Sequence, residues 1–281
     1  MLSTRILTAA IALAAVVAAL FLLPPRAFGV LLLVVVAAAA HEWARLAGLA
    51  TAAQWTFIGV VVLAGLGLLF LPAAGFDRGW PDGIALTVCG VATAFWLLVA
   101  TPWVVRRWPM RAGAGVMIAG WIVLLGAFVA LAELEARSPW LVLAAMAIVW
   151  IADTAAYFSG RAFGRHKLAP EVSPGKTWEG VYGALAAVAL YALALTPLAS
   201  TAGYEAALTP ATIAIWLAFV VAVAALSVVG DLFESWLKRQ AGAKDSGTLL
   251  PGHGGVLDRV DALLAAMPPL AIAALLALPK T

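Results

Sequence analysis

Long apolar runs separated by short polar connections dominate this chain. Nine runs approach the length of about 20 mostly apolar residues that a membrane-spanning helix needs. They cover residues 6–23, 27–41, 56–73, 84–105, 113–132, 139–158, 178–199, 210–230 and 256–278. The second run is short, and Pro268-Pro269 in the ninth predicts a kink. The pattern predicts an all-α, polytopic integral membrane protein with about nine transmembrane helices.

The polar connections between these runs predict how the chain is organised. The two longest cover residues 159–177 and 231–255. We expect a single membrane domain, in which residues 1–138 supply about five helices and residues 139–281 supply about four helices with the catalytic loops. The first run has about 18 residues, more than the roughly 7–15 of a signal-peptide core. Because Pro24-Pro25 follows it, we interpret it as a retained membrane helix.

Composition supports the membrane assignment and excludes some partners. The chain is 65% hydrophobic and 11% charged, whereas a soluble domain has about 25% charged residues. The net charge of +3 comes from basic residues in short loops, so we expect no nucleic-acid partner. The single cysteine, Cys89, excludes a disulfide framework.

The distribution of Lys and Arg predicts the orientation in the membrane. With a cytoplasmic N-terminus, alternation of nine helices leaves only Arg26, Arg78, Arg137 and Lys280 outside, and the other 13 of 17 inside. Cytoplasmic loops carry an excess of Lys and Arg. We therefore expect the N-terminus inside, the C-terminus outside, and both long polar loops in the cytoplasm (at the inner membrane if the source is bacterial). Tryptophans near helix ends predict an interfacial belt formed by Trp43, Trp55, Trp103, Trp108, Trp140, Trp178 and Trp236.

Residues 230–261 form the most polar stretch and are flanked by apolar runs on both sides. Carboxylates, cationic side chains, a histidine and several glycines alternate there. Charges beside a bilayer are costly and mark functional sites. Glycines let a backbone approach a ligand closely, and the mixture of charges indicates a polyphosphate with its metal. We therefore expect a polar active site on the cytoplasmic side.

Asp231 and Asp258 are the first candidates for chemistry. They end one predicted helix and begin the next, so the loop between them can return both to one depth. Two carboxylates with phosphate oxygens are what Mg²⁺ usually takes. The alternative is a pair of interfacial charges bonded to Arg239 or Arg259. Asp261 follows Asp258 by one turn, as Glu234 follows Asp231, and each is either functional or structural.

The connection at 159–177 and the apolar run before it hold a second group of candidates. Asp153 lies near the cytoplasmic end of the run and is either functional or an interhelical hydrogen-bond partner. Ser173-Pro-Gly-Lys-Thr opens the next predicted helix, whose free N–H groups suit a phosphate. Lys176 would add charge, and Ser173 and Thr177 would add hydroxyls. The alternative is a helix cap with positive-inside charges.

Two further residues keep open alternatives. His253, between glycines, either donates to a phosphate or structures its loop. Glu42 ends the second predicted helix as an interfacial cap or reaches the active site.

At these residues the chain resembles the phosphatidate cytidylyltransferase (CDP-diacylglycerol synthase) family. From Ser235 to Asp261, every specified position of the family pattern is filled, through Lys-Arg, Lys-Asp, Pro-x-His-Gly-Gly and Asp-Arg-x-Asp. Residues 152–180 and Glu-Trp-Ala-Arg-Leu-Ala-Gly (42–48) are also similar to the family. Two departures are Ala155, where glycine is common, and Gly175, where lysine is common.

The resemblance implies that CTP and phosphatidic acid give CDP-diacylglycerol and pyrophosphate for phospholipid synthesis, with Mg²⁺ as cofactor. The implied catalytic residues are Asp231, Asp258, Lys244 and Asp153. The implied substrate-binding residues are Ser173, Lys176, Thr177, Ser235, Lys238, Arg239, His253, Gly254, Gly255 and Arg259. The implied metal ligands are Asp231, Asp258 and Asp261. The partners are CTP, phosphatidic acid and the lipid bilayer, and a homodimer is left open.

Two alternative functions are a CTP-dependent lipid or polyprenol kinase and an ion-coupled transporter. A transporter would place charges near the bilayer midplane and would carry internal repeats. The sequence instead gathers its charges on one side and has no evident repeat.

Overall fold

The computed structural model describes residues 2–76, 79–199, 209–249 and 254–278. Its N-terminal elements are α1 (Leu2–Leu22), α2 (Pro25–Leu46), α3 (Thr51–Phe70), the short helix η1 (Pro72–Ala74), α4 (Asp82–Phe95), the π-helical turn η2 (Trp96–Ala100), α5 (Thr101–Arg106) and α6 (Ala114–Arg137). They are followed by α7 (Pro139–Phe163), β1 (Lys167–Ala169), β2 (Ser173–Thr177), α8 (Trp178–Ala199), α9 (Pro210–Gln240) and α10 (Leu257–Ala277). The only strands in the described ranges form one antiparallel hairpin, so the all-α prediction is confirmed.

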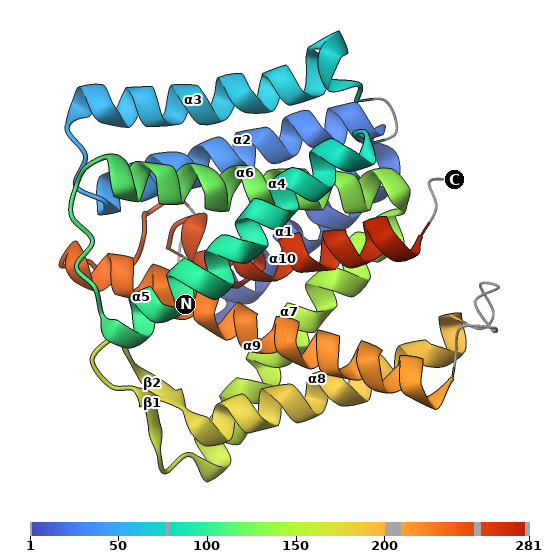
Figure 1. Ribbon diagram of the computed structural model, residues 1–281. Coiled ribbons are helices and arrows are strands. Elements are labelled where there is room, and N and C mark those ends of the chain that lie inside the picture. The colour runs from blue at the N-terminus through green and yellow to red at the C-terminus, as the bar shows by residue number, and fades with distance from the viewer. Residues whose placement is uncertain (1, 77–78, 200–208, 250–253, 279–281) are drawn as a thin grey trace.

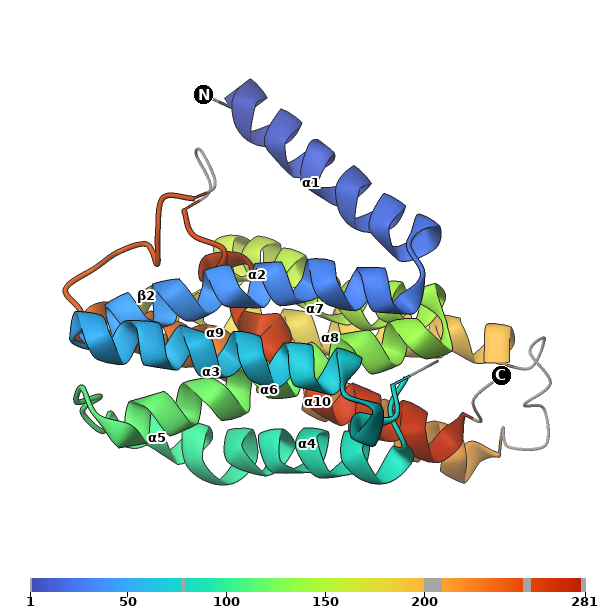
Figure 2. The same ribbon diagram turned by 90° about the horizontal axis from the view of Figure 1, so that it is seen from above.

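The helices are long and apolar enough to cross a membrane. In the described part of the chain, eight helical spans meet that condition, and α4, η2 and α5 form one of them as Asp82–Arg106. The remaining predicted run, residues 6–23, overlaps α1, which diverges from the other helices (Figure 2). Large apolar side chains such as Leu63, Leu98 and Ile215 are exposed on the outside, as expected where lipid covers the protein.

Turn chemistry explains where several helices begin. Pro25, Pro139 and Pro210 each occupy a first helical position, where the missing N–H costs nothing. Thr209 adds a capping box to α9. Its hydroxyl accepts from the Thr212 amide, and the Thr212 hydroxyl accepts from the Thr209 amide. The boundaries therefore follow from local sequence.

The last helix, α10, lies at the centre of the bundle. It packs against α9, α6 and α4, and most of its side chains are buried. It continues through Pro268 and Pro269 as a single helix. The C-terminal end of α9, the start of α10 and the β-hairpin lie toward the same end of the bundle (Figure 1). The structure therefore brings the polar segments together at one end.

The interfacial assignment of the tryptophans needs one correction. Trp55 and Trp140 are exposed, as the prediction requires, but Trp43 is fully buried, and its indole N–H donates to the Val116 carbonyl at 3.1 Å. Its ring stacks on Phe233 of α9. The prediction is therefore wrong for Trp43, because a helix-end position does not say which way a side chain faces.

Candidate active site

A close helix crossing brings Asp231 next to the start of α10. The prediction that Asp231 ends its helix is wrong, because α9 continues to Gln240. Gly230 of α9 faces α10 so closely that a Cβ there would lie 2.6 Å from the Asp261 carbonyl oxygen and 2.9 Å from the Ala265 Cβ. Real Cβ atoms do not approach other atoms so closely, so only glycine fits without a shift. Asp231 follows this contact directly and therefore lies next to the acidic start of α10.

An aromatic cluster around Phe233 holds α9 in position. Phe233 is buried, stacks with Trp43, and makes edge contacts with Phe95, Trp96 and Trp103. Such pairs add about 0.5–1.5 kcal/mol each beyond burial of area. The cluster therefore holds the turn that carries Asp231 and Glu234 in one orientation.

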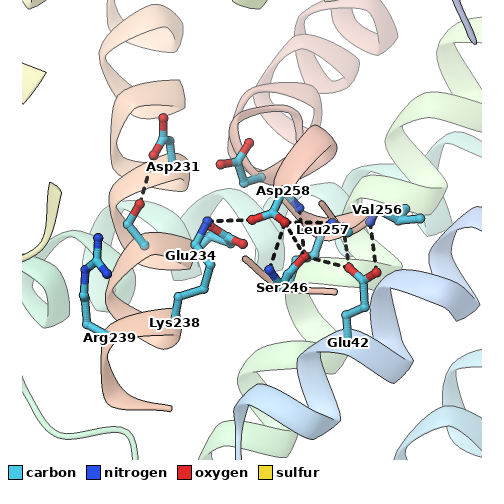
Figure 3. Close-up of polar contacts among 12 residues, drawn as sticks. Glu42, Asp231, Glu234, Lys238, Arg239, Ser246, Val256, Leu257 and Asp258 are labelled. Carbon is cyan, nitrogen blue, oxygen red and sulfur yellow. Dashed lines mark hydrogen bonds and ion pairs between the residues drawn. The ribbon is translucent and has the colours of Figure 1, made fainter. Parts of the chain in front are cut away.

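Asp258, in the first turn of α10, is surrounded by hydrogen-bond donors (Figure 3). Its Oδ2 accepts from the Ser246 amide at 2.8 Å, the Ser246 hydroxyl at 2.9 Å and the Gly255 amide at 2.8 Å. Its Oδ1 accepts from the Lys238 ammonium at 2.6 Å. The carboxylate is therefore fixed in position by the loop before α10 and by α9.

Lys238 joins two buried carboxylates. Its Nζ lies 2.6 Å from Asp258 Oδ1 and 2.5 Å from Glu234 Oε2. The side chains of Glu234 and Asp258 are only 3% and 7% exposed. Removing one partner of a buried ion pair costs about 3–5 kcal/mol, because a charge is left uncompensated. In this arrangement Glu234 serves as an ion-pair partner of Lys238.

Asp231 contacts the β-hairpin through Lys176. The Lys176 Nζ lies 2.6 Å from Asp231 Oδ2, and the Ser235 hydroxyl donates to Asp231 Oδ1 at 3.2 Å. Both charged side chains are about a quarter exposed, 24% for the lysine and 29% for the aspartate. The hairpin and α9 thus present an accessible ion pair beside the buried one.

The other acidic candidates lie near this pair. Asp153 of α7 and Asp261 of α10 both lie within electrostatic range of Asp231 and Lys176. Asp261 Oδ1 accepts from the following amide, that of Ala262, at 2.7 Å. Within the described ranges, no three His, Cys, Asp or Glu side chains are arranged to hold a metal ion by themselves. A metal here would need further ligand atoms from a substrate or from water.

The segment Ser173–Thr177 differs from the prediction. It was expected to open a helix, but it forms strand β2, and α8 begins only at Trp178. The Thr177 hydroxyl accepts from the Gly180 amide at 3.1 Å, and this buried side chain caps α8. Antiparallel pairing with β1 overrides the helical expectation, because the strand returns the chain to the start of α8. Lys176 therefore reaches the site from a strand.

The remaining candidates are placed differently. Arg239 donates through Nε to the Val172 carbonyl at 3.2 Å, which ties α9 to the hairpin loop. Lys244 and Arg259 are exposed at the same end of the bundle. Gly254 adopts a left-handed φ of 82° just before Gly255, whose amide reaches Asp258. His253 lies outside the described residues.

Ser246 was missed by the sequence-based selection, and Glu42 was left open between an interfacial cap and a residue of the site. Ser246 occupies an unspecified position of the family pattern, yet its amide and hydroxyl both bond Asp258. Glu42 belongs to α2, and its side chain reaches the start of α10 (Figure 3). The sequence signals for Glu42 were its place at the end of an apolar run and the family-like segment 42–48, and neither reveals a contact across about 200 residues.

The fold and this cluster define a polytopic integral membrane protein with a charged, phosphate-compatible site at one end of its helices. The chain belongs to the cytidylyltransferase family, whose model matches residues 3–277. It is 40% identical over 274 residues to the phosphatidate cytidylyltransferase of Pseudomonas aeruginosa, covering 95% of each chain. It is 36% identical to the protein of that name from Haemophilus influenzae, covering 95% of this chain and 96% of the relative. A Brucella suis protein of the same name is 41% identical over 231 residues, covering 80% of this chain and 76% of the relative.

Proposed function

We propose that this chain transfers the cytidylyl group of CTP to phosphatidic acid, giving CDP-diacylglycerol and pyrophosphate. The observation that carries the proposal is the set of paired acidic and cationic side chains at the start of α10, in a chain whose full-length relatives bear the name phosphatidate cytidylyltransferase. In this reaction a phosphate oxygen of the lipid attacks the α-phosphorus of CTP. The bond from that phosphorus to the bridging oxygen breaks, and pyrophosphate leaves.

The residues suit a reaction that depends on positioning and charge neutralisation. Phosphoryl and nucleotidyl transfers need little covalent chemistry from the protein. Lys176, Arg239, Lys244 and Arg259 would hold phosphate groups, with hydroxyls from Ser173 and Ser235. Lys238 is more enclosed and would chiefly hold Asp258. We propose that the buried Thr177 acts as the cap of α8 and supports Lys176.

The acidic side chains fit a hard divalent cation. Mg²⁺ commonly binds through one or two carboxylates together with substrate phosphates and waters. Asp231 and Asp258 each pair with a lysine ammonium at 2.6 Å, so a metal ion bound to these carboxylates would have to replace these ion pairs. We propose that Asp231 and Asp258, with Asp261, hold Mg²⁺ when the nucleotide binds. The ion would neutralise charge on the phosphates during transfer.

The lipid would approach from the membrane side of α7. An apolar hollow of about 340 Å³ is lined by Ala147, Trp150, Ile151, Thr154 and Ala155. It lies on the helix that carries Asp153, and we propose that it receives part of an acyl chain. The nucleotide would come from the cytoplasm, where we place both polar loops on the basis of the positive charges near them.

A labelling experiment tests the reaction. Purified protein is incubated with phosphatidic acid, Mg²⁺ and CTP labelled on either the α- or the γ-phosphate. We expect α-label in the lipid product and γ-label in pyrophosphate. Entry of γ-label into lipid would instead indicate a kinase, and the absence of both labels from lipid would refute the proposed transfer.

A further inference from the structure

Glu42 is a buried carboxylate from a helix that contributes nothing else to the site's charges. It lies near the C-terminal end of α2 and is only 1% exposed. Its Oε1 accepts from the Val256 amide at 3.0 Å, and its Oε2 accepts from the Leu257 amide at 2.8 Å and the Ser246 hydroxyl at 2.8 Å. All three donors belong to the α10 start or to the loop before it (Figure 3).

These bonds supply a helix cap that α10 lacks locally. The N-cap residue of α10 is Val256, and no side chain at that position caps the helix. The first amides of a helix need acceptors, and the positive end of the helix dipole favours a negative charge. Glu42 meets both needs from a residue more than 200 positions away in the chain. The start of α10 therefore depends on a contact with α2.

Two glycines of the polar loop leave room for the Glu42 carboxylate. A Cβ on Gly247 would lie 2.4 Å from Glu42 Oε1, and one on Gly255 would lie 2.4 Å from Glu42 Oε2. Any larger residue at either position would displace the carboxylate or the loop. The backbone of the loop is therefore packed directly onto Glu42.

Ser246 connects Glu42 to Asp258. Its hydroxyl lies 2.8 Å from Glu42 Oε2 and 2.9 Å from Asp258 Oδ2, while its amide also donates to Asp258. A hydroxyl carries one proton, so it donates to one carboxylate at a time. Backbone amides keep each carboxylate bonded in either case. A displacement of Glu42 is thereby transmitted to Asp258.

We infer that Glu42 is a positioning residue, which anchors Ser246 and the first turn of α10 so that Asp258 stays in its place in the site. The expected effect on kcat rests on the proposed function, whereas the anchoring of the first turn of α10 by Glu42 does not. Residues that orient ligand-bearing groups typically change activity by about 10–100-fold when they are replaced. Glu42 makes this contribution through Ser246 and α10 rather than through the substrate.

The test compares Glu42→Gln with Glu171→Gln, a matched change at an exposed glutamate paired with Arg107. In Glu42→Gln the amide group must face at least one of the three donors. We expect kcat for CDP-lipid formation to fall on the order of 10–100-fold, with KM for CTP changed less than about threefold, because the binding cations remain. Hydrogen exchange of the amides at 255–258 should accelerate, whereas Glu171→Gln should match the wild type in both measurements.

A second variant keeps the test decisive if Glu42→Gln does not fold. Gly247→Ala leaves Glu42 unmutated, but the new methyl group would displace its carboxylate. This variant should therefore also lose kcat and show faster exchange of the same amides. Gly90→Ala is its control, because a Cβ there meets nothing within 4 Å. Wild-type kcat and exchange in Glu42→Gln, or in Gly247→Ala if that alone folds, would overturn the inference. The inference would also be overturned if the fraction of unfolded variant, measured by thermal scans, accounted for the whole loss of kcat. A wild-type protein without α-label transfer, but with the exchange effect, would refute the function and leave the anchoring role intact.

Discussion

Replacing Asp258 with asparagine separates the structural role of this carboxylate from its chemical one. In the native site, Oδ1 faces Lys238 and Oδ2 accepts from three donors supplied by Ser246 and Gly255. An asparagine amide must turn its NH₂ toward one of these two donor sets. Either orientation removes one of the two carboxylate charges that face Lys238, leaving Glu234 alone, and places an NH₂ group opposite another donor.

The magnitude follows from burial. The Asp258 side chain is 7% exposed and Lys238 is 15% exposed, so losing one partner should cost about 3–5 kcal/mol. At about 2–4 °C per kcal/mol, the thermal transition should fall by roughly 6–20 °C. Asp231→Asn is the matched comparison, because its pair with Lys176 is more exposed and should contribute only about 0–1 kcal/mol to stability.

The assay combines thermal unfolding in detergent, followed by tryptophan fluorescence, with initial rates of CDP-lipid formation across a Mg²⁺ titration. We expect both variants to lose nearly all turnover, but only Asp258→Asn to lose substantial stability. If the two carboxylates act as one unit, the double variant should be hardly slower than either single variant. Equal thermal transitions for the two variants would refute the structural reasoning, and substantial turnover in either at ordinary Mg²⁺ would refute the proposed shared metal.

Three other predictions follow from particular contacts. Lys176→Ala should lose about 1.5–3 kcal/mol of phosphate binding, which lowers the rate at subsaturating substrate roughly 10–150-fold. Lys167→Ala in the same hairpin should have little effect on that rate. Similar rates for the two variants would show that Lys176 has only a structural role. Gly230→Ala should separate α9 from α10 and abolish most turnover, whereas Gly90→Ala should be tolerated, and activity measurements on both check this. Pro170→Cys should react with an impermeant thiol reagent only from the cytoplasmic face in oriented vesicles, and labelling from the outer face would overturn the proposed orientation.

The helical framework was predictable because its physical cause is local. Eight of the nine predicted apolar runs overlap an observed span in the described residues, and Pro25, Pro139 and Pro210 begin helices as their fixed backbone geometry requires. The polar stretch after residue 230 was also identifiable, since charges next to apolar runs stand out in any membrane sequence. The hairpin at 167–177 was missed because strand pairing is a contact between segments, which helical periodicity cannot reveal.

What the sequence determined by itself was the class of protein, the order of its helices, and most of the charged residues of the site. Only the tertiary structure decided how those charges pair: Lys238 with Glu234 and Asp258, and Lys176 with Asp231. It alone brought Glu42 onto the start of α10 and made Trp43 a core residue. The reason is that hydropathy depends on neighbours along the chain, whereas a buried carboxylate needs donors that only the crossing of distant helices can supply.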